Sequence, residues 1–440
     1  MLNALGVARR TLMEYLAAVL MLVLFAVNIP IAFAMAIAAM SFFIFAEGLP
    51  LRVFVQKFVQ VTDSFPLLAV PFFICAGAIM NHAGITRRLL NLADALVGHL
   101  VGGLAQANVV LATLMGGLSA SANADAAMQA KMLGPEMVRR GYSAGFAAAI
   151  TACAAVITPI IPPGIGLIIY GYLADVSVGR LFIGGIVPGL MMCGALMLAV
   201  HWVSKRRGYL PLREKRVSTR ELGRAVIDGM GALSIVAFIL LGIRYGIFTP
   251  TEAGAMTVVY ATLIGVLWHR ELKWSSAPAI ILETVLATSA VMIIICAASA
   301  FGFYMSWERI PARGAEFLIK LTQQPWLLLL LINVGLFIVG MLIEGTAALI
   351  LLTPILVPAV IKVGIDPLHF GLVIVINLTI GGVTPPVGTM MFTTCSIMRV
   401  KIETFVKEGW PFVLALTVVL MLVTYIPPLA VWLPTRLMGP

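Results

Sequence analysis

Two short polar segments of this strongly apolar chain carry oxygen atoms of the kind that a hard cation prefers. The first contains Ser119, Ser121 and Asn123, and the second is Glu344-Gly345-Thr346. In transport proteins, side-chain oxygens of this kind bind Na⁺ together with free backbone carbonyls. We therefore expect each segment to supply part of a cation site.

Each polar segment is followed by a stretch in which Thr, Pro and Gly interrupt an apolar run. The two stretches are Thr158–Gly164, which contains Pro162 and Pro163, and Thr384–Gly388, which contains Pro385 and Pro386. A proline pair donates no backbone N–H, so the carbonyls before it are freed. Such carbonyls are tolerated at membrane depth only when they are buried in protein or face a water-filled cavity. The stretches predict two broken helices that complete the cation sites with Thr158, Thr384 and Gly388.

A structural alternative stays open for each site taken alone. Ser and Thr often hydrogen-bond to their own helix backbone, and Pro-Gly segments can be simple kinks. The carboxylate of Glu344 fits a helix cap as well as a cation ligand, whereas Glu252 is typical of a cap alone. The occurrence of both features at matching positions in two halves favours the cation sites. Helix N-termini at such breaks also suit an anionic substrate.

Composition restricts the protein class. Of 440 residues, 61% are hydrophobic and 11% are charged, against ~25% charged in a soluble domain. At ~20 residues per spanning helix, the chain holds apolar material for ~12 spans. This excludes a soluble enzyme, a nucleic-acid-binding protein and a secreted disulfide scaffold. The net charge of +10 is typical of cytoplasmic loops in a membrane protein.

One basic stretch, residues 204–228, divides the chain near its middle. It holds eight Lys and Arg residues against three acids, so the positive-inside rule places it in the cytoplasm. The two sides of this linker form an internal repeat. Aligning the proline pairs, Pro162 with Pro385, also pairs Pro135 with Pro358 without a gap. The same alignment places the two polar segments opposite each other.

In each half, the polar segment lies between two apolar arms of about 15 residues, which rise ~22 Å and fall short of a ~30 Å hydrocarbon core. This favours re-entrant helical hairpins over two ordinary tilted spans. The first hairpin ends at Arg139 and Arg140, and the second has only Lys362, so we expect halves of inverted topology. The predicted organisation is therefore N-terminal scaffold helices (1–64), a first repeat (65–203) with a hairpin at about 104–138 and a broken helix at about 144–174, a basic cytoplasmic linker (204–228), second-half scaffold helices (229–325), a second hairpin and broken helix (326–398) and a C-terminal helix (399–440).

Catalytic signatures are missing from the sequence. It contains neither the H-E-x-x-H motif of metalloproteases nor the G-x-x-x-x-G-K-[ST] motif that binds ATP. The five cysteines stand alone in apolar runs and are expected to be buried hydrophobic residues. We predict a protein that is not an enzyme and has no organic cofactor.

Several motifs resemble the large membrane (M) subunit of TRAP (tripartite ATP-independent periplasmic) transporters of the dicarboxylate type. The resemblance extends from about Tyr15 to Trp432 and depends on the order and spacing of six segments. These are Leu68-Ala-Val-Pro-Phe-Phe-Ile74, Arg140-Gly-Tyr-Ser-Ala-Gly-Phe146, Thr158-Pro-Ile-Ile-Pro-Pro163, Ile343-Glu-Gly-Thr346, Leu351-Leu-Thr-Pro-Ile-Leu356 and Thr384-Pro-Pro-Val-Gly388.

The resemblance implies an all-α polytopic membrane protein of the bacterial inner membrane. It would import a small organic acid with Na⁺ by an elevator mechanism, in which hairpin-bearing parts slide against a scaffold. Its partners would be a small four-helix membrane (Q) subunit and a periplasmic substrate-binding protein (P). Since no four-helix unit precedes Tyr15, we expect the small subunit to be a separate chain.

The resemblance also implies particular ligands for at least two Na⁺ ions. One ion would lie among Ser119, Ser121, Asn123 and the segment from Thr158 to Gly164. The other would lie among Glu344, Gly345, Thr346 and the segment from Gly381 through Thr384 to Gly388. Substrate would lie between the hairpin ends, near Asn123, Thr346 and Asn377.

The chain departs from the family pattern at two site positions. Asn123 stands where the family often has an apolar residue, which adds a polar ligand. Gly164 stands where the family often has Ser after the proline pair, which removes one hydroxyl from the first site. Alternative readings are a stand-alone ion-coupled carboxylate carrier, which fits the repeat equally well, and an intramembrane enzyme or channel.

Overall fold

The structure is a computed structural model that describes residues 15–27, 29–45, 49–116 and 121–439. Within these ranges the regular secondary structure consists of helices alone. Eight of the helices are long and apolar enough to cross a membrane, and several shorter apolar helices accompany them. The described chain is therefore that of an all-α polytopic membrane protein, as the composition predicts.

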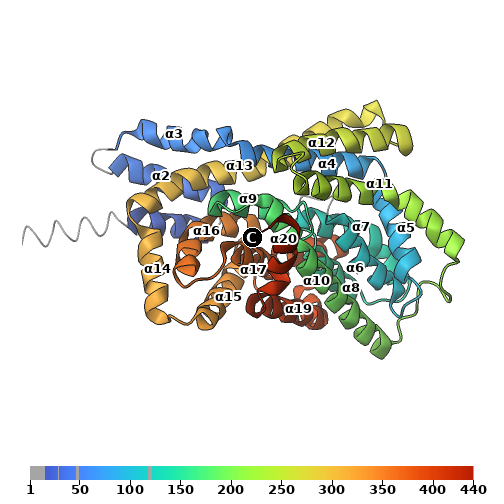
Figure 1. Ribbon diagram of the computed structural model, residues 1–440. Coiled ribbons are helices and arrows are strands. Elements are labelled where there is room, and N and C mark those ends of the chain that lie inside the picture. The colour runs from blue at the N-terminus through green and yellow to red at the C-terminus, as the bar shows by residue number, and fades with distance from the viewer. Residues whose placement is uncertain (1–14, 28, 46–48, 117–120, 440) are drawn as a thin grey trace, which may run out of the picture.

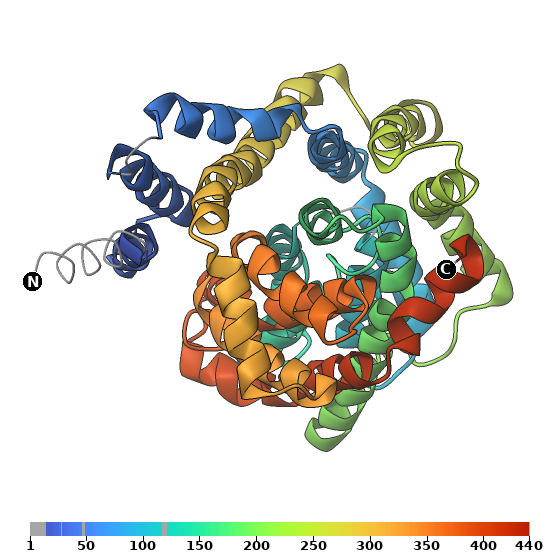
Figure 2. The same ribbon diagram turned by 60° about the vertical axis from the view of Figure 1, so that its left-hand side comes forward.

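An outer layer of helices lies along one side of the molecule, where α4 packs on α12 and α2 packs on α13 (Figures 1 and 2). Two amphipathic helices, α5 (Ile85–Val97) and α14 (Ile310–Leu321), connect this layer to the rest of the chain. The outer layer contains the helix Tyr15–Ala26, α2 (Ile31–Phe45), α3 (Leu51–Gln60), α4 (Ala69–His82), α11 (Thr219–Arg244), α12 (Pro250–Leu263) and α13 (Ala277–Trp307).

The remaining helices form a core in which the two halves of the chain interlock. Helix α7 packs against α18 of the other half, and α16 packs against α9 in the corresponding way. The core contains α6 (Gly103–Met115), α7 (Ala122–Arg139), α8 (Ala144–Ala155), α9 (Ile165–Ala174), α10 (Val178–Arg207), α15 (Pro325–Leu342), α16 (Gly345–Lys362), α17 (Pro367–Gly381), α18 (Thr389–Met398), α19 (Ile402–Tyr425) and α20 (Pro428–Met438).

The internal repeat is visible in the helix boundaries. When the two proline pairs are aligned, the first residues of α7 and α16 coincide, and so do their last residues. The residue before each helix caps it, since Ser121 accepts a hydrogen bond from the Ala124 amide and Glu344 accepts one from the Ala347 amide. The contacts are also reciprocal, because α4–α12 corresponds to α13–α2. The predicted fold class of two repeats, each with a helix pair and a broken helix, is confirmed.

Two predicted boundaries differ from the structure, each for a local reason. The linker predicted at 204–228 is helical at both ends, because α10 continues to Arg207 and Ser218 caps α11, leaving only residues 208–218 irregular. The C-terminal region is two helices rather than one, since consecutive prolines at 427–428 cannot continue α19. The apolar N-terminal region contains the helix Tyr15–Ala26 and α2, with Pro30 directly before the second.

The shortened linker is fastened to the first half. The amides of Leu212 and Arg213 donate to the carbonyl of Gly98 at 2.8 and 3.1 Å. The Arg213 guanidinium pairs with Asp94 at 2.7 Å and with Glu221 at 2.6 Å. Nearby, the Tyr209 hydroxyl accepts a hydrogen bond from the Ser143 amide at 3.1 Å. These contacts tie the connection between the halves to α5, α8 and α11.

Close backbone contact holds the second broken helix against the second hairpin. A Cβ atom added to Gly381 of α17 would lie 2.5 Å from the carbonyl carbon of Gly340 on α15. Because main-chain atoms cannot move aside like a flexible side chain, the two helices approach this closely only with glycine at both positions. Gly335, also on α15, has open space around the corresponding point.

We predict that Gly381→Ala lowers the free energy of unfolding by roughly 1–3 kcal/mol, the typical effect of overpacking a tight contact. The matched variant Gly335→Ala should be neutral or slightly stabilising, because alanine favours the helix by ~1 kcal/mol over glycine. Thermal unfolding of the purified variants in detergent measures both effects. Equal melting temperatures for the two variants would contradict the packing argument.

Candidate functional site

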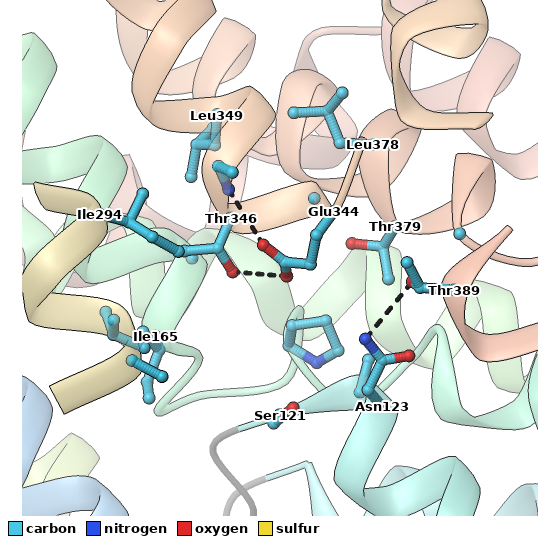
Figure 3. Close-up of a pocket in the computed structure, with 18 of the residues that line it drawn as sticks. Ser121, Asn123, Ile165, Ile294, Glu344, Thr346, Leu349, Leu378, Thr379 and Thr389 are labelled. Carbon is cyan, nitrogen blue, oxygen red and sulfur yellow. Dashed lines mark hydrogen bonds between the residues drawn. The ribbon is translucent and has the colours of Figure 1, made fainter. Parts of the chain in front are cut away.

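One cavity of about 390 Å³ lies where both helix pairs and both broken helices meet (Figure 3). The outer layer closes one side of it through α2, α4 and α13. Its described lining residues are Ile31, Ile74, Ser121, Ala122, Asn123, Pro159, Ile165, Gly166, Ala287, Ala290, Val291, Ile294, Glu344, Gly345, Thr346, Ala347, Leu349, Val375, Leu378, Thr379, Gly382, Thr389 and Met390. A volume at the lower end of the ~300–1,000 Å³ range of ligand pockets suits a small molecule.

The first polar segment joins the two halves at this cavity. The Asn123 side chain projects from the first turn of α7, and its Nδ2 donates to the Thr389 hydroxyl of α18 at 3.3 Å (Figure 3). The Asn123 Oδ1 is buried without a hydrogen-bond partner among the described residues. A buried oxygen of this kind is a candidate ligand for a cation or a substrate donor. Ser119 lies outside the described residues.

The second polar segment is organised around Glu344. Its carboxylate accepts hydrogen bonds from the Ala347 amide at 3.0 Å and from the Thr346 hydroxyl at 2.9 Å. Glu344 therefore caps α16, which is one of the two roles that its position predicts. Each carboxylate oxygen keeps a further acceptor site, so the cap leaves the cation role open. Glu344 is also the only charged side chain among the described lining residues.

Four helices begin at the cavity, because the lining includes the first residues of α7, α9, α16 and α18. The unbonded N–H groups of a helix N-terminus amount to a partial positive charge of ~0.5. The cavity can therefore attract an anion although its described lining contains no Lys, Arg or His.

The first helix break lies between α8 and α9 and contains a polar side chain without a partner in the described part of the chain. The Thr158 side chain is fully buried, and its hydroxyl has no hydrogen-bond partner among the described residues. The peptide bond between Pro162 and Pro163 is cis. Gly164 follows, and a Cβ atom there would overlap the Pro159 carbonyl oxygen. Pro159 lines the cavity, whereas Thr158 and Gly164 lie behind it.

The second break, between α17 and α18, satisfies more of its own backbone. The Thr384 hydroxyl donates to the Gly381 carbonyl at 2.8 Å, so it bonds to the backbone of its own segment as a purely structural threonine would. This bond does not use the lone pairs of the hydroxyl oxygen, which can still accept a cation. Gly388 has a positive φ of 23°, and its amide donates to the Met341 carbonyl at the end of α15 at 3.1 Å. Pro385 and Pro386 are joined by a cis bond. The described lining of the cavity does not include Gly381, Thr384 or Gly388, although Gly382 and Thr389 belong to it.

Asn377 does not occupy the position expected of a substrate ligand. It is fully buried on the face of α17 that meets α15, where its Nδ2 donates to the Asn333 carbonyl and side-chain oxygens at 3.0 and 2.6 Å. Its amide thus ties the broken helix to the hairpin arm. The cavity instead receives Thr379, which lies two residues further along the helix on another face.

Of the predicted site residues, the structure brings together Ser121, Asn123, Glu344, Gly345 and Thr346 in the lining of one cavity. Sequence reasoning missed two lining hydroxyls and the contribution of α13. Thr389 follows the predicted Gly388 directly, so its place at a helix N-terminus was available as a signal. The α13 residues gave none, because Ala287, Ala290, Val291 and Ile294 belong to an uninterrupted apolar run.

Comparison with known proteins identifies this architecture. Residues 18–429 match the family described as "Tripartite ATP-independent periplasmic transporter, DctM component". The chain belongs to the DctM family of TRAP transporters. It is a multi-pass protein of the bacterial inner membrane and a transporter permease rather than an enzyme.

Relatives in the DctM family carry different substrate names. The chain is 36% identical to the "Sialic acid TRAP transporter large permease protein SiaM" of Vibrio cholerae, over 94% of this chain and 96% of that protein. It is 37% identical to the "C4-dicarboxylate TRAP transporter large permease protein DctM" of Pseudomonas aeruginosa, over 87% and 89%. It is 40% identical to the "Isethionate TRAP transporter permease protein DctMQ" of Oleidesulfovibrio alaskensis, over 91% of this chain but only 63% of that longer protein.

Among solved structures, the chain shares its fold with the Alcanivorax borkumensis YdaH transporter. The TM-score is 0.62 at 16% sequence identity, and the match covers 88% of this chain and 90% of the other. At this identity the likeness concerns the arrangement of the helices and not the substrate.

We predict that Glu344→Ala lowers the free energy of unfolding by about 1 kcal/mol, because it removes the acceptor that caps α16. Glu344→Gln should lose less, since its amide oxygen can still accept from the Ala347 amide. Chemical denaturation of both variants in detergent provides the comparison. If the two variants were equally destabilised, the negative charge rather than the cap would be the stabilising feature.

Proposed function

We propose that this chain imports a small organic acid together with Na⁺, as the large membrane subunit of a tripartite system. The observation that carries the proposal is the cavity at the N-termini of four helices, between both polar segments and both helix breaks. Such a cavity favours an anion through helix dipoles. The oxygens around it favour a cation, so the same small cavity could bind both the organic anion and Na⁺.

At least two Na⁺ ions would be held by oxygens on the two sides of the cavity. On the first side, the Thr158 hydroxyl and Asn123 Oδ1, which have no partners among the described residues, are the strongest candidates, because buried oxygens without donors suit a cation. Ser121 and the carbonyls of the first break would complete that site. On the second side, the segment Glu344–Thr346 and the break from Gly381 to Gly388 would together form the second Na⁺ site. No organic cofactor is required.

Transport would proceed by an elevator movement of the core against the outer layer. The cavity lies between core residues and side chains of α2, α4 and α13, so displacement of the core would carry the bound substrate past a surface that stays in place. In this proposal the helix pairs α6–α7 and α15–α16 are re-entrant hairpins in halves of inverted topology. Helix α6, with 13 residues, is shorter than a membrane span requires, which supports that assignment for the first pair.

The family name provides the partners of the proposal. The words "tripartite" and "periplasmic" in the family description agree with two further components, which in this proposal are a small four-helix membrane subunit and a periplasmic substrate-binding protein. Relatives are named for isethionate, sialic acid and C4-dicarboxylates, all of them small organic acids. The chain would work in the lipid bilayer with these two proteins and a substrate of that kind, without nucleic acid.

The test is solute uptake into proteoliposomes that contain this chain and its small subunit. Each candidate acid is offered with and without a Na⁺ gradient, and with and without the periplasmic binding protein. Uptake that requires both supports the proposal. Na⁺-driven uptake that ignores the binding protein would instead identify a stand-alone carrier, and uptake without Na⁺ would contradict the coupling.

Within that assay, we predict that Thr158→Val raises the Na⁺ concentration for half-maximal uptake about tenfold. A ligand hydroxyl contributes about 1.5 kcal/mol to a charged partner, and each ~1.4 kcal/mol is a factor of ten. Ser121→Ala and Thr384→Ala should reduce Na⁺-dependent uptake in the same direction. Thr417→Val, which removes a hydroxyl bonded to the Val413 carbonyl of its own helix, is the matched control. Unchanged Na⁺ dependence in all three site variants would reject the assignment of these oxygens.

A further inference from the structure

The cavity has a polar end and an apolar end. Asn123, Thr379 and Thr389 lie together on one side, whereas Ile165 and Ile294 lie on the opposite side (Figure 3). Glu344 and Thr346 lie between these two groups. Leu349 of α16 lies on the side of Ile294 (Figure 3), and Ile74 of α4 and Val291 of α13 are further apolar side chains of the lining.

The repeat explains why the two ends differ. In the alignment that pairs Pro162 with Pro385, Asn123 corresponds to Thr346 and Thr389 corresponds to Gly166. Asn123 and Thr389 form a side-chain hydrogen bond of 3.3 Å at one end. At the other end Gly166 has no side chain, and the space beside it is shared by Ile165, Val375 and Leu349. A two-fold related framework thus encloses a cavity whose chemistry is not two-fold related.

We propose that the preferred substrate is a monocarboxylate with a compact aliphatic body, and that Asn123 and Thr389 bind its carboxylate. This inference rests on the proposed function and specifies its substrate class. The carboxylate lies at the polar end, and the aliphatic body lies against Ile165 and Ile294.

The donors at the polar end suit one carboxylate. Thr389 accepts the hydrogen bond from Asn123, so its own hydroxyl proton is free to donate into the cavity. The second Nδ2 proton of Asn123 is a further donor. Helices α7 and α18 both begin here and add their partial positive charge.

The remainder of the cavity disfavours a second carboxylate or several hydroxyl groups. A second carboxylate would lie near the Glu344 carboxylate, which repels it, or beside Ile165 and Ile294, whose side chains donate no hydrogen bond. The hydroxyl groups of a sugar acid would face Ile165, Ile294 and Val291, which can neither donate nor accept hydrogen bonds. Hydroxyls without partners weaken binding, whereas aliphatic carbon gains from the same contact.

The direct test is equilibrium binding to the full-length chain in lipid nanodiscs with sodium chloride, without the periplasmic protein. The probes are 4-methyl-2-oxopentanoate, 2-oxoglutarate and gluconate, three acids that share a terminal carboxylate and differ in the rest of the molecule. We expect 4-methyl-2-oxopentanoate to bind at least about tenfold more tightly than either competitor, within the range that an apolar pocket discriminates. Displacement of the radiolabelled branched acid by the other two measures this ratio.

Variants locate the preference within the cavity. Ile294→Thr should weaken binding of the branched acid about tenfold and leave 2-oxoglutarate binding unchanged or stronger. Val291→Thr, nearly equal in volume, tests the same wall if the first variant is unstable. Asn123→Leu should weaken all the carboxylates, and Thr417→Val is the control outside the cavity.

The outcomes separate this inference from the proposed function. Tighter binding of 2-oxoglutarate or gluconate would overturn the substrate class while leaving an organic-acid transporter. Equal binding of all three acids, or selectivity unaffected by both wall variants, would also overturn it. Absence of binding by any organic acid would reject the proposed function and the inference together.

Discussion

The broken helices and helix pairs of this protein end in its interior, where their backbone groups have little access to water. Every such group needs a partner in protein or a ligand. The second break finds protein partners, since the Gly388 amide donates to Met341 and the Gly382 carbonyl accepts from Met390. At the first break the Thr158 amide donates to the Ala155 carbonyl, but the Thr158 side-chain hydroxyl has no partner among the described residues. The backbone groups named at the second break are therefore satisfied by the protein itself, whereas a polar group at the first break remains available to a ligand.

Helix N-termini create a positive electrostatic potential at the cavity. Four of them reach one cavity, so an anion can be attracted without a basic side chain whose long stem would need space and desolvation. Ser121 and Glu344 show how the repeats diverge within this scheme, because they cap equivalent helices with a neutral and a charged oxygen. A shared framework fixes where the helices begin, and the individual residues then decide what each side of the cavity binds.

Much of this arrangement follows from the sequence, because proline pairs and polar segments in apolar runs have few structural solutions in a membrane. The repeat, the helix pairs and five lining residues were predictable in that way. Asn377 lies outside the cavity lining because α15 covers it, and an apolar run does not reveal which helix face meets a neighbour. For the same reason nothing in the sequence distinguished Ile294 from the other apolar residues of α13. Tertiary packing decides which of several similar apolar residues in the sequence lines the cavity.

The fastened linker has a mechanical consequence. Eleven irregular residues, 208–218, join α10 of the core to α11 of the outer layer, and fully extended they could span about 36 Å. In the structure the segment is held in a folded conformation by hydrogen bonds from the Leu212 and Arg213 amides to the Gly98 carbonyl. If these contacts broke, the linker could extend and allow the two layers to move further apart, with the loss of only a few surface contacts. In the proposed elevator movement, release of these contacts would extend the distance over which the core can move.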